Sequence, residues 1–506
     1  MNTESKYIAS LKLAAIGDAL GWMTEFEKSK QSLENKFKTD FIDTFNYWEK
    51  NVGGRFHGYV DKLEAGSYSD DTQLLLSVAR SIKNDGTVNQ NYFAKNELPD
   101  WLLYSRGAGR TIKNAARKIQ RKSADWNNNF FTFKVGKTTI DYRESGANGA
   151  AMRILPIALA NFDKSEVIKE EIFCNSIVTH GHPRAILGAM LYGYSIDCIL
   201  KIIPENFNFT SFLTELGKDM HDKFSIDFIE NKRLQNWEAE WNKKSKLSFK
   251  ELFKAVINET QEFLRKIYKM LANNVSDFEV LKSIGCYQNE TKGSGTSTVL
   301  AGIYFVCRYA NNPIKSIEKA VNSIGTDTDS IAAFAEEFNG RSHGESVIPS
   351  KWKSVQDSDY INHVAIRLLE ISERRANLQK QTEKENAKNI SEVDSDSYIV
   401  NERVFLETLG GGIVKSIDRQ KPLTKGKYNL ILDVEFDIGQ FCRFAKLLNI
   451  EEIKNDVYFE ASNKEFASIN NLNLDENTKK QVENFMRTIN TEQQKELYEI
   501  LSLLKK

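Results

Sequence analysis

Apolar residues recur at helical spacing through most of the chain, up to about residue 380. Intervals of three and four residues between apolar positions indicate helices, whereas strict alternation indicates half-buried strands. Alternation is scarce in this part of the sequence, so we expect a mainly α-helical domain. The stretches with the clearest helical spacing are 8–20, 74–82, 186–203, 299–309, 317–324 and 331–338.

Two segments interrupt this helical pattern. Residues 204–250 are rich in Asn, Lys, Glu and aromatic residues, and we interpret them as an insertion. Residues 377–397 have almost no apolar content, which is typical of a linker. These boundaries predict a helical domain over residues 1–376, followed by the linker and by a C-terminal module of unknown role over residues 398–506.

The C-terminal module has a different pattern. Residues 428–436 alternate in part and predict a strand, and residues 475–505 have the apolar spacing of an amphipathic helix. The triplet Gly410–Gly412 could bind a phosphate, but it is more typical of a flexible turn. We therefore predict a small α+β module behind the helical domain.

Composition and charge narrow the class of protein. The 506 residues include 69 Lys and Arg and 69 Asp and Glu, and this balance gives no electrostatic case for nucleic acid or a membrane as the main partner. On such a neutral chain, the basic run 110–122 is typical of a solvated helix face. Five cysteines without a C-x-x-C pair argue against a disulfide framework or a structural zinc site. The N-terminus lacks a signal pattern and the apolar stretch behind it is too short and polar to span a bilayer, so we expect a cytoplasmic protein.

A first acidic cluster, Ser69, Asp70 and Asp71, stands just before the apolar stretch that begins near Leu74. One carboxylate at that place is an ordinary helix cap, because the helix dipole favours negative charge at the N-terminus. Two adjacent carboxylates repel each other and are costly to desolvate together, so capping explains only one of them.

A second acidic cluster, Asp327, Asp329 and Ser330, precedes another helical stretch in the same way. Residues two positions apart do not share a face of a regular helix, but both can converge on one point from a loop that leads into a helix. Taken separately, each cluster is typical of a solvated cap. Taken together, the two clusters resemble the halves of a hard-cation site, because Mg²⁺ and Mn²⁺ prefer oxygen ligands.

Several further residues have two interpretations each. By spacing alone, Glu25 is a surface glutamate and His180 a structural histidine. Residues Gly146–Gly149 form either a turn or a helix start whose N–H groups suit a diphosphate. Gly293 and Ser294 belong to a glycine-rich loop. Arg153 either compensates a phosphate or pairs internally, and the sequence leaves both open.

Blocks of sequence in a fixed order resemble the ADP-ribosylglycohydrolase family over about residues 7–375. Each block is unspecific by itself, but the ordered combination is specific. The blocks are Gly17–Glu25, Ser67–Thr72, Gly146–Arg153, Thr179-His180, Gly325–Ala333 and Ile348–Trp352. The resemblance implies an orthogonal bundle of α-helices around a binuclear metal centre, with two Mg²⁺ or Mn²⁺ ions as cofactors.

The resemblance also implies roles for individual residues. The implied metal ligands are Ser69, Asp70, Asp71, Asp327, Asp329 and Ser330. The implied catalytic residues are Glu25, Asp70 and Asp71. The implied substrate-binding residues are Gly146, Asn148, Gly149, His180, Gly293 and Ser294. The family commonly has threonine at the places of Ser69 and Ser330, and serine keeps the ligating oxygen.

These assignments predict a metal-dependent hydrolase that releases ADP-ribose from an ADP-ribosylated protein, through an arginine or serine linkage, or from a related small conjugate. Two alternatives are a catalytically inactive ADP-ribose-binding or structural protein on the same fold, and a Mg²⁺-dependent nucleotide-diphosphate hydrolase. We expect the insertion and the C-terminal module to influence the choice of substrate or to recruit a partner protein.

Overall fold

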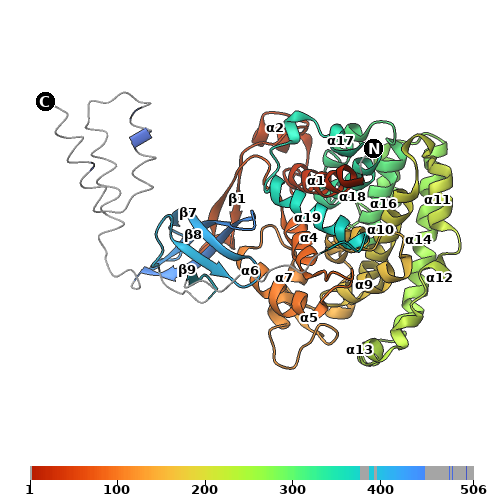
Figure 1. Ribbon diagram of the computed structural model, residues 1–506, viewed down its shortest axis with the longest axis horizontal. Helices are drawn as coiled ribbons and strands as arrows, with labels where there is room; N and C mark the ends of the chain where they lie inside the picture. The colour runs from red at the N-terminus through yellow and green to blue at the C-terminus, as the bar shows by residue number, and fades with distance from the viewer. Residues whose placement is uncertain are drawn as a thin grey trace. The chain divides into compact units, whose positions relative to one another are not determined.

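The computed structural model describes residues 3–376, 387–391 and 396–450, together with positions 478, 481, 482 and 497; of residues 204 and 336–343 it describes the backbone alone. The chain divides into two units, Met1–Trp48 with Leu63–Lys380 and Glu49–Lys62 with Gln381–Lys506. The first unit is helical and the second contains a small sheet, which confirms the predicted mainly α fold with a C-terminal sheet module (Figure 1).

Helices of very different length make up the first unit, beside one short hairpin of β3 (Thr132–Val135) and β4 (Thr138–Asp141). The longer helices are α1 (Thr3–Trp22), α4 (Asp70–Ser81), α7 (Arg110–Lys118), α9 (Ser165–Ile177), α10 (Pro183–Lys201), α11 (Phe209–Gly217), α13 (Lys232–Asn242), α14 (Phe249–Ala272), α16 (Gly295–Arg308), α17 (Pro313–Val321), α18 (Thr328–His343) and α19 (Ser358–Ser372). The shorter ones are α2 (Lys30–Phe37), α5 (Gln90–Tyr92), η1 (Phe93–Glu97), α6 (Leu98–Tyr104), η2 (Tyr142–Glu144), η3 (Asn148–Arg153), α8 (Leu155–Ala160), η4 (Pro204–Asn206), α12 (Met220–Lys223), η5 (Asp227–Glu230), α15 (Asp277–Ser283), η6 (Gly344–Val347) and η7 (Ser350–Trp352). No helix in the described part of the chain has the length and apolar character needed to cross a bilayer.

Helix α1 forms the core of the first unit. Every residue from Tyr7 to Trp22 is buried except Lys12, and α1 packs most extensively along α18 (Figure 1). Two glycines allow this close approach, because a Cβ atom at Gly17 would lie 2.7 Å from the carbonyl carbon of Ala332, and one at Gly21 would lie 2.4 Å from Cα of Asp329. The start of α18, which carries Asp329, therefore packs directly against α1.

Replacing Gly21 by alanine is expected to destabilise the first unit by about 1–3 kcal/mol, because the new methyl group overlaps the backbone of α18 and one helix must move. Urea unfolding followed by circular dichroism measures the effect. Gly109→Ala is the matched control, since a Cβ atom there meets nothing within 4 Å and the residue already has a φ of −64°. Equal midpoints for the two variants would contradict this account of the α1–α18 contact.

The second unit is built around a five-stranded sheet with the order β5-β6-β7-β8-β9. Its strands are β5 (Lys388–Asn389), β6 (Arg403–Leu406), β7 (Gly410–Gln420), β8 (Lys427–Phe436) and β9 (Phe441–Asn449). Strands β5 and β6 are parallel, and every other neighbouring pair is antiparallel. Strand β8 confirms the strand predicted over residues 428–436.

Two expectations for the second unit differ from the structure. The turn predicted at Gly410–Gly412 is wrong, because these glycines begin β7 and pair with β6. A Cβ atom at Gly411 would lie 2.6 Å from Nη2 of Arg403, so a larger residue there would displace the end of that side chain. Within the predicted linker, Lys388 and Asn389 form β5. Linker residues 377–386 and 392–395 lie outside the described residues. The helix predicted over 475–505 also lies outside them, apart from the isolated positions named above.

Residues 49–62 of a hairpin from early in the chain belong to the second unit. It consists of β1 (Trp48–Val52), the single turn α3 (Gly54–His57) and β2 (Tyr59–Leu63). The Arg443 guanidinium donates to Asp61 of this hairpin at 2.9 Å and to both carboxylate oxygens of Asp433 at 2.6 and 2.8 Å. The Gln420 side chain both donates to and accepts from the Val60 backbone, at 2.9 and 2.7 Å. The C-terminal sheet therefore holds a segment that ends a few residues before the first acidic cluster.

Candidate active site

Asp18 of α1 fixes the start of α4. Its carboxylate accepts hydrogen bonds from the backbone N–H groups of Ser69 and Thr72, each at 3.0 Å, and from the Thr72 hydroxyl at 2.6 Å. Burial raises the pKa of Asp18, and these hydrogen bonds counteract the rise. Asp18 therefore supports the first acidic cluster by satisfying N–H groups that a helix start leaves without partners.

The two acidic clusters meet at the starts of α4 and α18. Ser69 is the N-cap of α4, and Asp70 and Asp71 fill its first turn. The Ser330 hydroxyl donates to Oδ2 of Asp71 at 2.6 Å, across 259 positions of sequence. Asp329, the neighbour of Ser330, is also buried. The helix-cap interpretation holds for Ser69, but the contact shows that the clusters are not separate solvated caps.

Negative charges surround the Asp71 carboxylate. Burial raises its pKa well above the ordinary value for aspartate, and the charges of Asp18, Asp70 and Asp327 raise it further. The hydrogen bond from Ser330 lowers the pKa only in part. Like charges in a poorly hydrated place favour the protonated form, or a bound cation that offsets them.

The second cluster has the same character. Burial raises the pKa of Asp329 well above the ordinary value, followed by the charges of Glu25, Asp71 and Asp327. Glu25 lies just beyond α1 and is half-buried, and its N–H donates to the Gly21 carbonyl at 3.0 Å. The structure thus brings Glu25 close to Asp329, which the spacing of the sequence could not show.

The oxygen atoms of the two clusters suit a hard divalent cation. Among the residues that the structure describes, no three carboxylate, imidazole or thiol groups already converge in a metal-ligand geometry, and Oδ2 of Asp71 accepts from Ser330 instead. The main influences on the pKa values of Asp71 and Asp329 are burial and other carboxylates, with no positive charge among them. The donor set therefore fits Mg²⁺ or Mn²⁺ by its chemistry, because the Ser330 hydroxyl oxygen keeps a lone pair for a cation while its proton is donated to Asp71.

Two glycine-containing loops lie against the second cluster. The N–H of Asn148 donates to the Gly293 carbonyl at 2.9 Å, and the N–H of Gly295 donates to the Gly146 carbonyl at 3.0 Å. The Asn148 side-chain amide approaches Oδ2 of Asp327 at 3.4 Å. Ser294 caps α16 by accepting from the N–H of Ser297. We call residues Gly146–Gly149 the glycine loop. Through Asn148, this loop contacts both Gly293 and the second acidic cluster.

His180 stands beside the glycine loop as a neutral imidazole. It is buried, and its Nδ1 shares a hydrogen bond with the Thr179 hydroxyl at 2.8 Å. Burial, followed by the charge of Arg153, lowers its pKa to about 3. A Cβ atom at Gly149 would lie 2.9 Å from the imidazole, so the ring requires glycine there. His180 can therefore donate or accept a hydrogen bond, but it carries no charge at neutral pH.

The insertion at residues 204–250 supports the segment that carries His180. It forms η4, α11, α12, η5 and α13, and Trp237 and Trp241 of α13 are buried. The Trp241 indole donates to the Gly181 carbonyl at 2.8 Å, and the Trp237 indole donates to the Tyr142 hydroxyl at 3.1 Å. The Tyr142 hydroxyl in turn lies 2.5 Å from the Ile177 carbonyl, to which it donates. The insertion is thus part of the wall behind the site.

Lys113 is a neighbour of the site that the sequence interpretation missed. It lies in the basic run predicted as a solvated helix face, but α7 buries Ile112, Ala115 and Ala116. Burial lowers the pKa of Lys113, and the charge of Asp70 counteracts this effect. The apolar residues at helical spacing within the run were a signal that position 113 borders the buried face.

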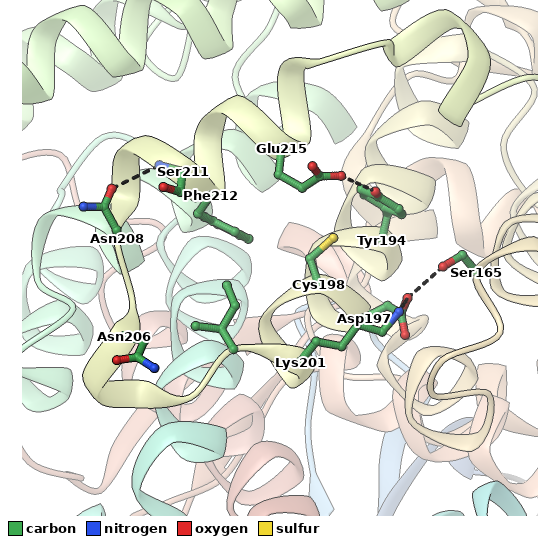
Figure 2. A pocket seen from close by; sticks show the side chains of 11 residues that line it. Ser165, Tyr194, Asp197, Cys198, Lys201, Asn206, Asn208, Ser211, Phe212 and Glu215 are labelled. Atoms are coloured by element: carbon green, nitrogen blue, oxygen red, sulfur yellow. Dashed lines mark hydrogen bonds and ion pairs between the residues drawn. The ribbon is translucent and has the colours of Figure 1, made fainter.

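A separate cavity of about 490 Å³ opens at the other end of α10. Figure 2 shows Tyr194 facing Glu215 and Ser165 facing Asp197 across its wall. Lys201 pairs with Asp197 at 2.9 Å, so the charged groups of the wall satisfy one another. None of the residues that line this cavity belongs to the acidic clusters or to the glycine loop, and we assign the candidate site to the clusters.

Comparison with known proteins decides the family. The model of the ADP-ribosylglycohydrolase family matches residues 1–378. This chain belongs to the ADP-ribosylglycohydrolase family. Members of this family are hydrolases that act on glycosidic bonds. In this ADP-ribosylglycohydrolase, the matched residues include both acidic clusters and both glycine-containing loops, and the match ends before β5 begins.

Named relatives of this ADP-ribosylglycohydrolase are distant. The chain is 29% identical over 189 residues to the ADP-ribosyl-dinitrogen reductase glycohydrolase of Rhodospirillum rubrum, a match that spans 37% of this chain and only 55% of that protein. It is 25% identical over 373 residues to the ADP-ribosylhydrolase ARH3 of Xenopus tropicalis, with 69% of this chain and 90% of that protein covered. A solved structure of an ADP-ribosylglycohydrolase-related protein complex aligns with a TM-score of 0.45 and 15% identity, over 73% of this chain and 98% of that chain.

Proposed function

We propose that this chain is a divalent-cation-dependent hydrolase that releases ADP-ribose from an ADP-ribosylated protein, with an arginine or serine linkage, or from a related small conjugate. The observation that carries the proposal is the contact between Ser330 and Asp71, which joins two buried acidic clusters in a member of this family. The names of the two relatives above, a glycohydrolase of an ADP-ribosylated protein and an ADP-ribosylhydrolase, support the substrate class.

The proposed cofactors are two Mg²⁺ or Mn²⁺ ions. The residues that would hold them are Ser69, Asp70, Asp71, Asp327, Asp329 and Ser330. Such ions supply Lewis-acid chemistry, which polarises ribose oxygens and lowers the pKa of water. The mutual repulsion of Asp71 and Asp329 supports their presence, because a cation between the clusters would offset it.

The proposed substrate lies with its diphosphate on the glycine loop and its adenosine side toward Gly293 and Ser294. The backbone hydrogen bond between Asn148 and Gly293 supports this arrangement, because it makes the two loops one surface. Glycines in the loop allow a ligand to approach the backbone closely. The neutral His180 would offer a hydrogen bond to the diphosphate or the ribose.

Hydrolysis would proceed through an oxocarbenium-like transition state at C1″ of the ribose. The oxygen of water bonds to C1″, the bond from C1″ to the nitrogen or oxygen of the leaving group breaks, and a proton passes from water to that leaving atom. Glu25, Asp70 and Asp71 are the proposed carriers of this proton. The half-buried position of Glu25 beside Asp329 supports its role, since solvent reaches it while it remains within the acidic clusters.

The parts outside the catalytic clusters are proposed to select the target. In this proposal, residues 1–376 are the catalytic domain, and the linker 377–397 connects it to the C-terminal module 398–506. The module recruits a partner protein, or it acts with the insertion 204–250 to determine which linkage is cleaved. The hydrogen bonds of Gln420 and Arg443 to the early hairpin support an influence of the module, because the hairpin ends only a few residues before the first acidic cluster in the sequence.

Product analysis tests the proposed reaction. The full chain is incubated with Mg²⁺ and with proteins ADP-ribosylated either on arginine or on serine, in separate reactions, and the released nucleotides are separated by chromatography. We expect free ADP-ribose, released faster from one linkage than from the other. Release of AMP with ribose phosphate would identify a nucleotide-diphosphate hydrolase instead. Binding of ADP-ribose without release from either protein or from small conjugates would identify an inactive binding protein.

A further inference from the structure

Arg153, the last residue of η3, is fully buried behind the glycine loop. Its Nη1 donates to the Gly149 carbonyl at 2.8 Å. Its Nε and Nη2 donate to the side-chain and backbone oxygens of Asn175, each at 2.8 Å, and the guanidinium lies 5.1 Å from the centre of the Phe93 ring. Arg153 therefore holds the carbonyl of Gly149 inward and ties the glycine loop to α9.

The charge of Arg153 has no carboxylate partner among the residues that the structure describes. Within the described part of the chain, no ion pair joins Arg153 to Asp or Glu, whereas the well-buried Arg80 pairs with Glu97. Burial lowers the pKa of Arg153 to about 9, so the guanidinium stays charged at neutral pH. A buried cation that has only dipoles as partners is costly to the fold. The three oxygens that accept from the guanidinium satisfy its donors but leave its net charge without a counter-charge among the described residues.

The charge acts where the proposed diphosphate would lie. It contributes to the low pKa of His180, so its field reaches the groups beside the glycine loop. Those groups include Asn148, whose side chain approaches Asp327 of the second acidic cluster. A field that penalises a proton on His180 must favour a negative charge placed at the same loop, because the sign of the interaction is reversed.

We propose that Arg153 is a positioning residue for the diphosphate of the ADP-ribosyl group: it fixes the glycine loop through Gly149 and supplies, from behind the loop, the positive charge that the bound anion balances. This inference rests on the proposed function, since it takes ADP-ribose as the ligand. It also favours the first of the two roles that the sequence left open for Arg153, because the described residues give it no internal counter-charge.

Calorimetric titration of the full chain with ADP-ribose, ADP and adenosine, each in Mg²⁺, tests this role. The variants are Arg153→Met, which removes the charge, and Asn175→Asp, which leaves Arg153 in place but sets a carboxylate at its Nε. Both variants are expected to bind ADP-ribose and ADP about tenfold more weakly than the parent chain does. Their affinity for adenosine should change by less than about twofold, because only the two diphosphates carry charge. Arg153→Lys should fall between Arg153→Met and the parent chain. Arg265→Met, at an exposed ion pair on α14, is the control for net charge and should change none of the three affinities.

The outcomes separate the possible failures. Equal losses for ADP-ribose and adenosine would mean a structural role, and unchanged preference for diphosphates in both charge-neutralising variants would overturn the inference. If Arg153→Met does not fold, Asn175→Asp alone decides, since it retains every donor of the guanidinium. The parent chain could bind ADP-ribose and release it from an ADP-ribosylated protein while the variants still prefer diphosphates to adenosine. In that case the role of Arg153 is wrong and the proposed function is unaffected. If the parent chain neither binds ADP-ribose nor releases it from an ADP-ribosylated protein, both the proposed function and the role of Arg153 are rejected.

Discussion

Asparagine in place of Asp329 is expected to reduce the rate of ADP-ribose release by about 10³-fold, because a divalent cation supplies several kcal/mol of transition-state stabilisation that this ligand would help to hold. Asparagine keeps the oxygen that accepts from the N–H of Ser330 at 2.8 Å, so the start of α18 should be preserved. The measurement is kcat on an ADP-ribosylated protein in saturating Mg²⁺. Asp40→Asn, at an exposed ion pair with Lys30, is the matched control and should retain full activity.

The same substitution has an opposite effect on stability. In chelator, Asp329→Asn removes one of several buried like charges, so the unfolding temperature should rise or stay equal. Added Mg²⁺ should raise the unfolding temperature of the parent chain, because a ligand of the folded state stabilises it, and should do so much less in the variant. A variant that hydrolyses at the parent rate, or that unfolds far below the parent in chelator, would show that Asp329 is a structural residue.

Methionine in place of Arg443 is expected to destabilise the second unit by about 3–5 kcal/mol, because two buried carboxylates, Asp61 and Asp433, would lose their cation. The side chains of all three residues are at most 13% exposed, so solvent cannot compensate for the loss. Urea unfolding, together with hydrogen exchange of peptides from β8, measures the change.

The second unit contains its own control for this prediction. Arg403 makes an equally close two-point contact with Asp437, at 2.8 Å for both oxygens, but the two side chains are 38% and 51% exposed. Exposed ion pairs contribute about 0–1 kcal/mol, so Arg403→Met should be nearly neutral. Similar losses in the two variants would contradict the view that the early hairpin is held by a buried charge network. For the same reason, deletion of residues 398–506 should leave Asp61 unpaired and destabilise the hairpin.

Local features of the candidate site could be predicted from the sequence. Asp70 and Asp71 follow a serine and precede apolar residues at helical spacing, and α4 begins at Asp70 with Ser69 as its cap. The second cluster precedes the same pattern, and α18 begins at Thr328. Helix starts are encoded by neighbouring residues, so they can be inferred without tertiary information.

The distances between these features could not be predicted in that way. Spacing contains no information that Ser330 contacts Asp71 across 259 positions, and only the family resemblance suggested that they meet. Asp18 lies between apolar residues of the predicted helix, which was a signal of a buried partner, but its partners at Ser69 and Thr72 depend on the packing of α1 against α4.

The place of the early hairpin could not be predicted from the sequence for a related reason. The composition of the chain changes near residue 380, and the predicted boundary follows that change. The hairpin at residues 49–62 nevertheless belongs to the second unit, because its partners, Gln420 and Arg443, lie in the C-terminal sheet. A single boundary drawn along the sequence divides the chain into consecutive stretches. It therefore cannot assign an early segment to a unit whose other residues lie far along the chain.

The most direct test of the central claim is the dependence of ADP-ribose release on a divalent cation. The full chain is treated with chelator, and release from an ADP-ribosylated protein is followed while Mg²⁺ or Mn²⁺ is added back. The arrangement of the two acidic clusters predicts no release in chelator and recovery of the full rate with either ion. An unchanged rate in chelator would contradict the assignment of these clusters as the metal centre of a hydrolase.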